Sequence, residues 1–346
     1  MRRDCGGDFS RRDGAASGYR VPRISELNIA DGEGMERPPT RIGALAPLTV
    51  PTWLAFVLHA AGTVVIALYL LFLLQAGSSM NDAWGFWIAW GGGLYDIPWL
   101  ERYAYVYSPA FAQIIGPLTG LHWEVFWVIW LFIQMGALVL LAGPFWAGVI
   151  VLLPWPSIHE YPNAVVATIE NGNPQLLLAL AIAAGLRWPA AWALPLLTKV
   201  TPGVGILWFA VRREWGRLAV AVGVTAGIVL VSLAFDSAVW NEWTTLLGEA
   251  SAADTLRMEP ILPLPLVVRA PLGLALLTWG ALTNRYWTVP IACMLCLPAI
   301  QLGGFALLVG TIPFLGLPLT PSWPLPSNDH ARRRGERTSA VGAEPQ

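Results

Sequence analysis

The stretch that decides the fold is "WLAFVLHAAGTVVIALYLLFLLQ", residues 53–75, which contains no Asp, Glu, Lys or Arg. An α-helix of this length crosses about 30 Å of hydrocarbon, the thickness of a bilayer core. The run is too long for the apolar region of a cleaved signal peptide. We therefore interpret it as a transmembrane helix.

Further apolar runs lie at residues 123–141, 218–235, 262–282 and 286–319, the last long enough for two spans if it turns near residues 301–304. Charged residues make up only 12% of the chain, against about 25% in soluble domains. The sequence thus predicts an all-α polytopic membrane protein surrounded by membrane lipids. A net charge of -1 without a basic stripe argues against nucleic acid as a partner.

Polar segments flank the apolar part. Residues 1–47 and 321–346 lack periodic apolar residues and are expected to be disordered tails, around a membrane domain at residues 48–320. Translation could instead begin at Met35. Cytoplasmic loops are enriched in Lys and Arg, so we place both termini in the cytoplasm and residues 77–103 and 236–260 outside a plasma membrane. The arginines that orient the chain this way are Arg37, Arg41, Arg212, Arg213, Arg217, Arg285 and those of the C-terminal tail.

The middle of the chain, residues 142–210, consists of short apolar pieces broken by prolines. Broken helices at membrane depth are tolerated only where they are buried in protein or line a cavity. This segment is therefore expected to contribute to a functional site.

Two acids follow the first span, Asp82 in "NDAWGFW" and Asp96 in "GGGLYD". Either could be an ordinary solvated loop acid. Aromatic neighbours would desolvate Asp82, however, which raises the pKa of a carboxyl group and makes it a stronger proton acceptor. In the following "YAYVYSP", Tyr105 and Tyr107 could be interfacial anchors or could stack on a sugar.

Polar side chains gather in "HEYPNAVVATIENGNPQ", residues 159–175. Ionisable groups at this depth are costly and are candidates for function. The candidates are His159, Glu160, Glu170, Asn173 and Gln175, although Glu170 could instead cap the next helix.

Lys199, in "LLTKVTP", is the only lysine of the chain and interrupts an apolar stretch. A buried ammonium requires an anionic partner, which could be a protein carboxylate or a lipid phosphate. Arg257 and Arg269 could line the rim of the same outer cavity. Cys293 and Cys296 form a CxxC without a second ligand pair, so we expect neither a metal nor a cofactor.

The early Asp, "GGGLYD" and the aromatic-Ser-Pro step resemble the membrane-embedded GT-C glycosyltransferases, in particular glycosyltransferase family 87, the actinobacterial polyprenyl-phosphate-mannose-dependent mannosyltransferases. "LLTKVTP" and "VRREWGR" are similar to that family's Lys-x-x-Pro step and Arg-rich turn, over roughly residues 52–319. The family's Gly-Gln-x-Asn step is replaced by Gly172-Asn173-Pro174-Gln175, and the loop at residues 236–260 is short.

The resemblance implies a bundle of roughly eight to ten transmembrane helices with an outward-facing cavity. It also implies an inverting hexosyltransferase that moves a sugar, mannose in this family, from a polyprenyl-phosphate donor to a glycolipid or glycan acceptor. Asp82 would be the base, and Lys199, with Arg257 or Arg269, would bind the donor phosphate. The expected substrate-binding residues are Asp96, Tyr105, Tyr107, His159, Glu160, Glu170, Asn173 and Gln175.

Two other classes remain open at this point. A multi-pass transporter would also need broken helices and a buried charge, although many transporters show internal repeats and none is visible here. A non-catalytic membrane partner protein is the second alternative.

Overall fold

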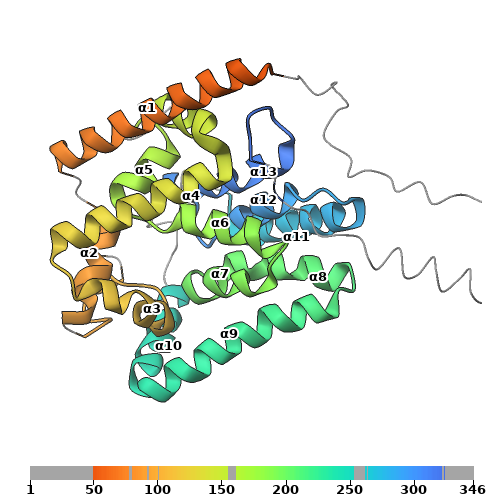
Figure 1. Ribbon diagram of the computed structural model, residues 1–346. Coiled ribbons are helices and arrows are strands. Elements are labelled where there is room, and N and C mark those ends of the chain that lie inside the picture. Colours follow the sequence, from red (N-terminus) through yellow and green to blue (C-terminus); the bar gives the residue numbers. More distant parts are fainter. Residues whose placement is uncertain are drawn as a thin grey trace, which may run out of the picture. The chain divides into compact units, whose positions relative to one another are not determined.

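The computed structural model describes residues 50–321 apart from 78–79, 92, 100, 155–160, 253–261 and 263, and also residue 323. Within these residues all regular secondary structure is helical, which confirms the predicted all-α class (Figure 1). The predicted tails lie outside the described residues except for Pro321 and Trp323, and His159, Glu160 and Arg257 lie outside them as well.

Four helices in the described part are long and apolar enough to cross a membrane: α1 (Thr52–Ala76), α4 (Trp123–Leu152), α9 (Trp215–Phe235) and α11 (Leu266–Thr283). Helices α1 and α9 expose large apolar side chains, among them Phe56, Phe72 and Phe235. Exposed apolar surface of this kind is suited to contact with lipid tails. The described residues thus contain fewer spans of full length than the eight to ten expected.

The apolar run at residues 286–319 does not form two long helices. It folds into α12 (Thr288–Leu295), the 3-10 helix η6 (Leu302–Thr311) and α13 (Ile312–Leu315). Pro298 lies in the gap after α12, and a proline disfavours helical backbone at the residue before it. Hydropathy alone could not show this break.

The remaining helices are short, as the prolines predict. Pro174 precedes α6, while Pro189 and Pro202 lie at the starts of η3 and η4, positions where a missing backbone N–H costs little. The short elements are α2 (Asn81–Ile88), η2 (Ala89–Gly91), α3 (Pro109–Thr119), α5 (Ala164–Asn171), α6 (Gln175–Gly185), η3 (Pro189–Trp192), α7 (Ala193–Thr198), η4 (Thr201–Ile206), α8 (Leu207–Val211) and α10 (Ser237–Ala252).

Helices α1 and α4 approach each other closely at a glycine. A Cβ on Gly62 would lie 2.2 Å from the carbonyl oxygen of Pro144, which belongs to the backbone of α4. The preceding Gly143 has φ 78° and kinks α4 at this point, a conformation that glycine adopts without a steric penalty. Small residues let membrane helices pack backbone to backbone.

We expect Gly62→Ala to destabilise the protein by about 1–3 kcal/mol, the usual cost of overpacking, because the added methyl group meets backbone that cannot rotate away. Thermal unfolding in detergent, followed by tryptophan fluorescence, measures this effect. Gly136→Ala is the matched control, since a Cβ at this position of α4 meets nothing within 4 Å. Equal melting temperatures for the two variants would contradict the predicted contact.

The arginine-bearing turn after α8 is fixed to the end of α11. Arg212 forms a 2.7 Å ion pair with Glu214 and donates hydrogen bonds to the carbonyl of Ala281 and the side chain of Asn284. From this turn α9 runs to α10, whose side chains line a cavity together with residues 95–99. The loop after the first span and the segment after α9, both predicted to lie outside the membrane, therefore lie side by side.

Candidate functional site

Asp82 lies in the first turn of α2, where the positive end of the helix dipole favours a carboxylate. The residue lies deep in the protein but keeps part of its surface accessible. Its Oδ2 accepts a hydrogen bond of 2.5 Å from Nδ2 of Asn173, at the start of the loop into α6. Two predicted site residues from distant parts of the sequence are thus in direct contact.

The turn between α5 and α6 holds Asn173 in this position. Gly172 ends α5 with φ 71°, and its carbonyl accepts a 2.7 Å hydrogen bond from Nε1 of Trp130. A Cβ on Gly172 would lie 2.4 Å from the Cβ of Ala83, so only glycine allows the turn to approach α2 this closely. The backbone N–H of Met80 donates to the carbonyl of Glu170 and ties the same two segments together.

A chain of polar contacts holds the start of α2 from the other side. Arg102 donates two hydrogen bonds to Oδ1 of Asn81, at 2.6 and 3.0 Å, and Nδ2 of Asn81 donates to Asn171 at 3.3 Å. Tyr161 also donates to Oδ1 of Asn171. These contacts restrict the helix turn that carries Asp82, and sequence reasoning did not single out Asn81, Arg102 or Tyr161.

Lys199 follows α7, and its Nζ lies 5.8 Å from the ring centroid of Tyr107. Like Asp82, it lies deep in the protein with part of its surface accessible. Burial raises the pKa of Asp82, an effect that the charge of Lys199 and the bond from Asn173 oppose. Burial likewise lowers the pKa of Lys199, and the charge of Asp82 opposes it.

Asp82 and Lys199 therefore act on each other electrostatically, yet no ion pair within 4.0 Å joins these two described side chains. Neither charge is therefore neutralised by direct pairing with the other. Burial and the charge of Asp82 also raise the pKa of Tyr107, which keeps its hydroxyl protonated.

The N-terminus of α3 fixes Tyr107 beside Lys199. The hydroxyl of Ser108 caps α3 and donates a hydrogen bond to the carbonyl of Leu197, two residues before Lys199. The hydroxyl of Tyr105 donates to the carbonyl of Ser108. Both tyrosines are buried, so they are packed in the interior rather than lying in a surface belt.

The other predicted residues are placed differently. Glu170 accepts a 3.1 Å hydrogen bond from the hydroxyl of Tyr69, and the Oε1 of buried Gln175 has no hydrogen-bond partner among the described residues. Asp96 is exposed and accepts from the backbone of Gly93. Arg269 is buried, and its guanidinium donates to four backbone carbonyls, which ties the start of α11 to the end of α12.

Two cavities lie beyond this cluster, and sequence reasoning missed the helix that they share. Helix α10 contributes Glu242 to both, and Asn241, Thr245 and Glu249 to the smaller one. Their spacing of one helical turn in the sequence was the signal that could have found them. Among the described residues no group of three or more His, Cys, Asp or Glu could hold a metal ion.

The fold and site define a helical membrane protein in which an interior carboxylate and an interior ammonium interact electrostatically without forming an ion pair. Residues 105–312, more than half of the chain, match the profile of glycosyltransferase family 87. The chain belongs to this family and is a membrane glycosyltransferase. Asn173 and Lys199 lie within the matched segment, and Asp82 precedes it. No curated protein and no solved structure matches the chain.

Proposed function

We propose that the protein transfers a hexose, with mannose as the first candidate, from a polyprenyl-phosphate donor to a lipid-linked or envelope glycan acceptor on the extracytoplasmic side. Asp82 is the catalytic base and Lys199 binds the donor phosphate. The observation that carries this proposal is the approach of Asp82 and Lys199 without direct pairing, with Asn173 bound to the carboxylate.

In this mechanism Asp82 accepts the proton of the acceptor hydroxyl. The hydroxyl oxygen attacks the anomeric carbon and forms the new glycosidic bond. The bond from that carbon to the phosphate oxygen breaks, and its electron pair leaves with the polyprenyl phosphate. Attack from the side opposite the phosphate inverts the configuration. Base catalysis and the fixed geometry of the two reactants supply the rate.

Lys199 stabilises the negative charge that develops on the departing phosphate. A preorganised cation in an interior site is worth more than one in water, because the surroundings screen it less. Arg269 is left out of this role because backbone carbonyls already engage its guanidinium. Asn173 orients Asp82, and Tyr107 borders the ammonium.

The deciding experiment is a transfer assay with the purified protein in nanodiscs, given labelled polyprenyl-phosphate mannose and a membrane glycolipid extract. The expected result is a labelled glycolipid whose new linkage has the inverted anomeric configuration. Polyprenyl-phosphate glucose tests sugar choice, and a nucleotide-linked mannose tests donor choice. Transfer from the nucleotide sugar, or no transfer from any polyprenyl-phosphate sugar, would overturn the proposal.

The pH profile of transfer should be bell-shaped, and it should be narrower than the profile that Asp and Lys with ordinary pKa values would give. The base acts only when ionised, so activity falls as the pH drops through a pKa above the ordinary Asp value of 3.8. The ammonium acts only when protonated, so activity falls as the pH rises through a pKa below 10.5. Lys199→Arg should remove the alkaline limb, because guanidinium stays protonated. An unmoved alkaline limb would contradict the role of Lys199.

A further inference from the structure

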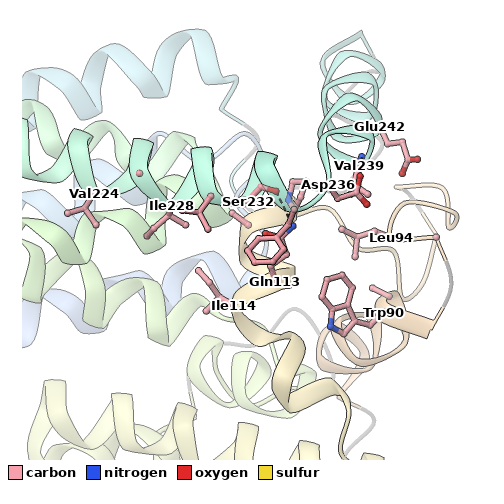
Figure 2. Close-up of a pocket in the computed structure, with 17 residues that line it drawn as sticks. Trp90, Leu94, Gln113, Ile114, Val224, Ile228, Ser232, Asp236, Val239 and Glu242 are labelled. Carbon is pink, nitrogen blue, oxygen red and sulfur yellow. Dashed lines mark hydrogen bonds between the residues drawn. The ribbon is translucent and has the colours of Figure 1, made fainter.

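The larger cavity of about 900 Å³ lies between α3, α9 and the segment that follows α2 (Figure 2). One face of α9 lines it with Val224, Gly227, Ile228, Val231, Ser232 and Phe235, which follow one another at helical spacing. This stripe extends along the helix for about 16 Å, at a rise of 1.5 Å per residue. The stripe belongs to a helix that is long and apolar enough to cross a membrane.

The lining becomes polar where α9 ends. Asp236 follows the last residue of α9, and Glu242 lies on α10 at the same side of the cavity as Trp90 and Leu94 (Figure 2). Glu242 also lines the second cavity of about 440 Å³. The apolar groove and the polar pocket thus share Glu242 as a lining residue.

The second cavity combines aromatic rings, acids, an amide and a hydroxyl, contributed by Tyr95, Asp96, Trp99, Asn241, Thr245 and Glu249. Carboxylates and amides accept hydrogen bonds from hydroxyl groups, and aromatic faces pack against apolar C–H surface. The charged residues that line the two cavities in the described part of the chain are all acids. Such a lining repels phosphate and suits an uncharged head that carries many hydroxyls.

We propose that these two cavities form the binding site for the acceptor glycolipid, with its alkyl chain along α9 and its neutral sugar head between Tyr95, Asp96 and α10. The role of this glycolipid as the acceptor rests on the proposed function, whereas the binding of a glycolipid does not. Helix α2 links the groove to the proposed transfer site: it carries Asp82 in its first turn and leads into Ala89 and Trp90, which line the groove.

The groove and the Lys199 region share a wall. Pro109 and Ala110 line the groove, while the adjacent Ser108 bonds to the carbonyl of Leu197. Leu197 and Ala110 pack together, with Ile228 of α9 against them. A glycolipid held in the groove would thus lie on the other side of this packed wall from the Lys199 region.

The test uses an alkyl α-mannoside with a diazirine in its chain, photocrosslinked to the full-length protein in nanodiscs and mapped by mass spectrometry. The expected labels lie on residues 224–235 and on α3. In Gly227→Leu the added side chain would take the place of part of the alkyl chain in the groove. Labelling should therefore fall about tenfold, the loss expected when two methylene groups of the probe lose their apolar contact. Gly223→Leu is the matched control, because both glycines have open space around a Cβ but only Gly227 lines the groove.

Head-group recognition is tested with Glu242→Gln and with an alkyl phosphate of the same chain length. The site predicts weaker mannoside labelling in Glu242→Gln and little labelling of the groove by the alkyl phosphate. Equal labelling by both probes, or labelling of α1 as strong as that of residues 224–235, would overturn the glycolipid site.

Two outcomes separate this inference from the proposed function. Labelling that persists in the Asp82→Asn protein, together with a raised acceptor KM and an unchanged kcat for Gly227→Leu, supports both. Labelling without any transfer by the unaltered protein supports the glycolipid site and rejects the proposed function. Normal acceptor KM in Gly227→Leu rejects the assignment of this groove to the acceptor.

Discussion

Replacing Asp82 with asparagine should lower sugar transfer by about 10²–10⁴-fold, the usual contribution of a positioned general base. Asparagine has nearly the same shape and can still bond to Asn173, but it cannot accept the proton of the acceptor hydroxyl. The rate of labelled product formation at saturating donor, with the purified variant in nanodiscs, measures the loss. The defect should appear in kcat rather than in the KM of either substrate.

Glu101→Gln makes the same chemical change at an exposed carboxylate and should leave transfer unchanged. The melting temperatures of both variants show whether they are folded. Undiminished transfer by folded Asp82→Asn protein would remove Asp82 from the role of base. In that case the first turn of α2 would hold a structural acid only.

Replacing Lys199 with methionine should lower kcat by about 10²–10³-fold, the range found when one electrostatic contact to a transition state is removed. Methionine has a similar length and no charge. The exchange also removes the cation that lowers the pKa of Asp82. The acidic limb of the pH profile should therefore move to higher pH, an effect that a purely structural lysine would not produce.

Lys199→Arg retains the cation and separates charge from packing. It should keep much more activity than Lys199→Met at neutral pH. If both variants transferred at the rate of the unaltered protein, Lys199 would have no part in binding the departing phosphate. If both failed equally while remaining folded, the requirement would be for the shape of the lysine side chain rather than for its charge.

Much of the fold could be predicted from the sequence because transfer of a helix into lipid depends on its own residues. The runs that begin at residues 53, 123, 218 and 262 correspond to α1, α4, α9 and α11. The run at residues 286–319 was misjudged because hydropathy does not register the break near Pro298. Asp82 and Lys199 could be picked out because a charged side chain in apolar surroundings is unfavourable unless a partner compensates its charge.

Arg269 shows the limit of this reasoning. From the sequence it was a cation suited to a phosphate, whereas the structure surrounds it with backbone carbonyls from residues 264, 295, 297 and 298. The carbonyls of residues 295, 297 and 298 become available only because α12 ends at Leu295. A partner that arises from chain geometry cannot be recognised from residue types.

The sequence by itself determined that this is a helical membrane protein and which charged residues are exceptional in it, since both follow from the cost of placing each side chain in a nonpolar medium. Only the tertiary structure decided that Asn173 bonds to Asp82, that Lys199 lies beside Tyr107, and that Glu242 of α10 lines two neighbouring cavities. These features depend on a left-handed glycine turn, a capped helix and the packing of distant segments. The free energy of each of these depends on which residues come into contact, and not on the type of any single residue.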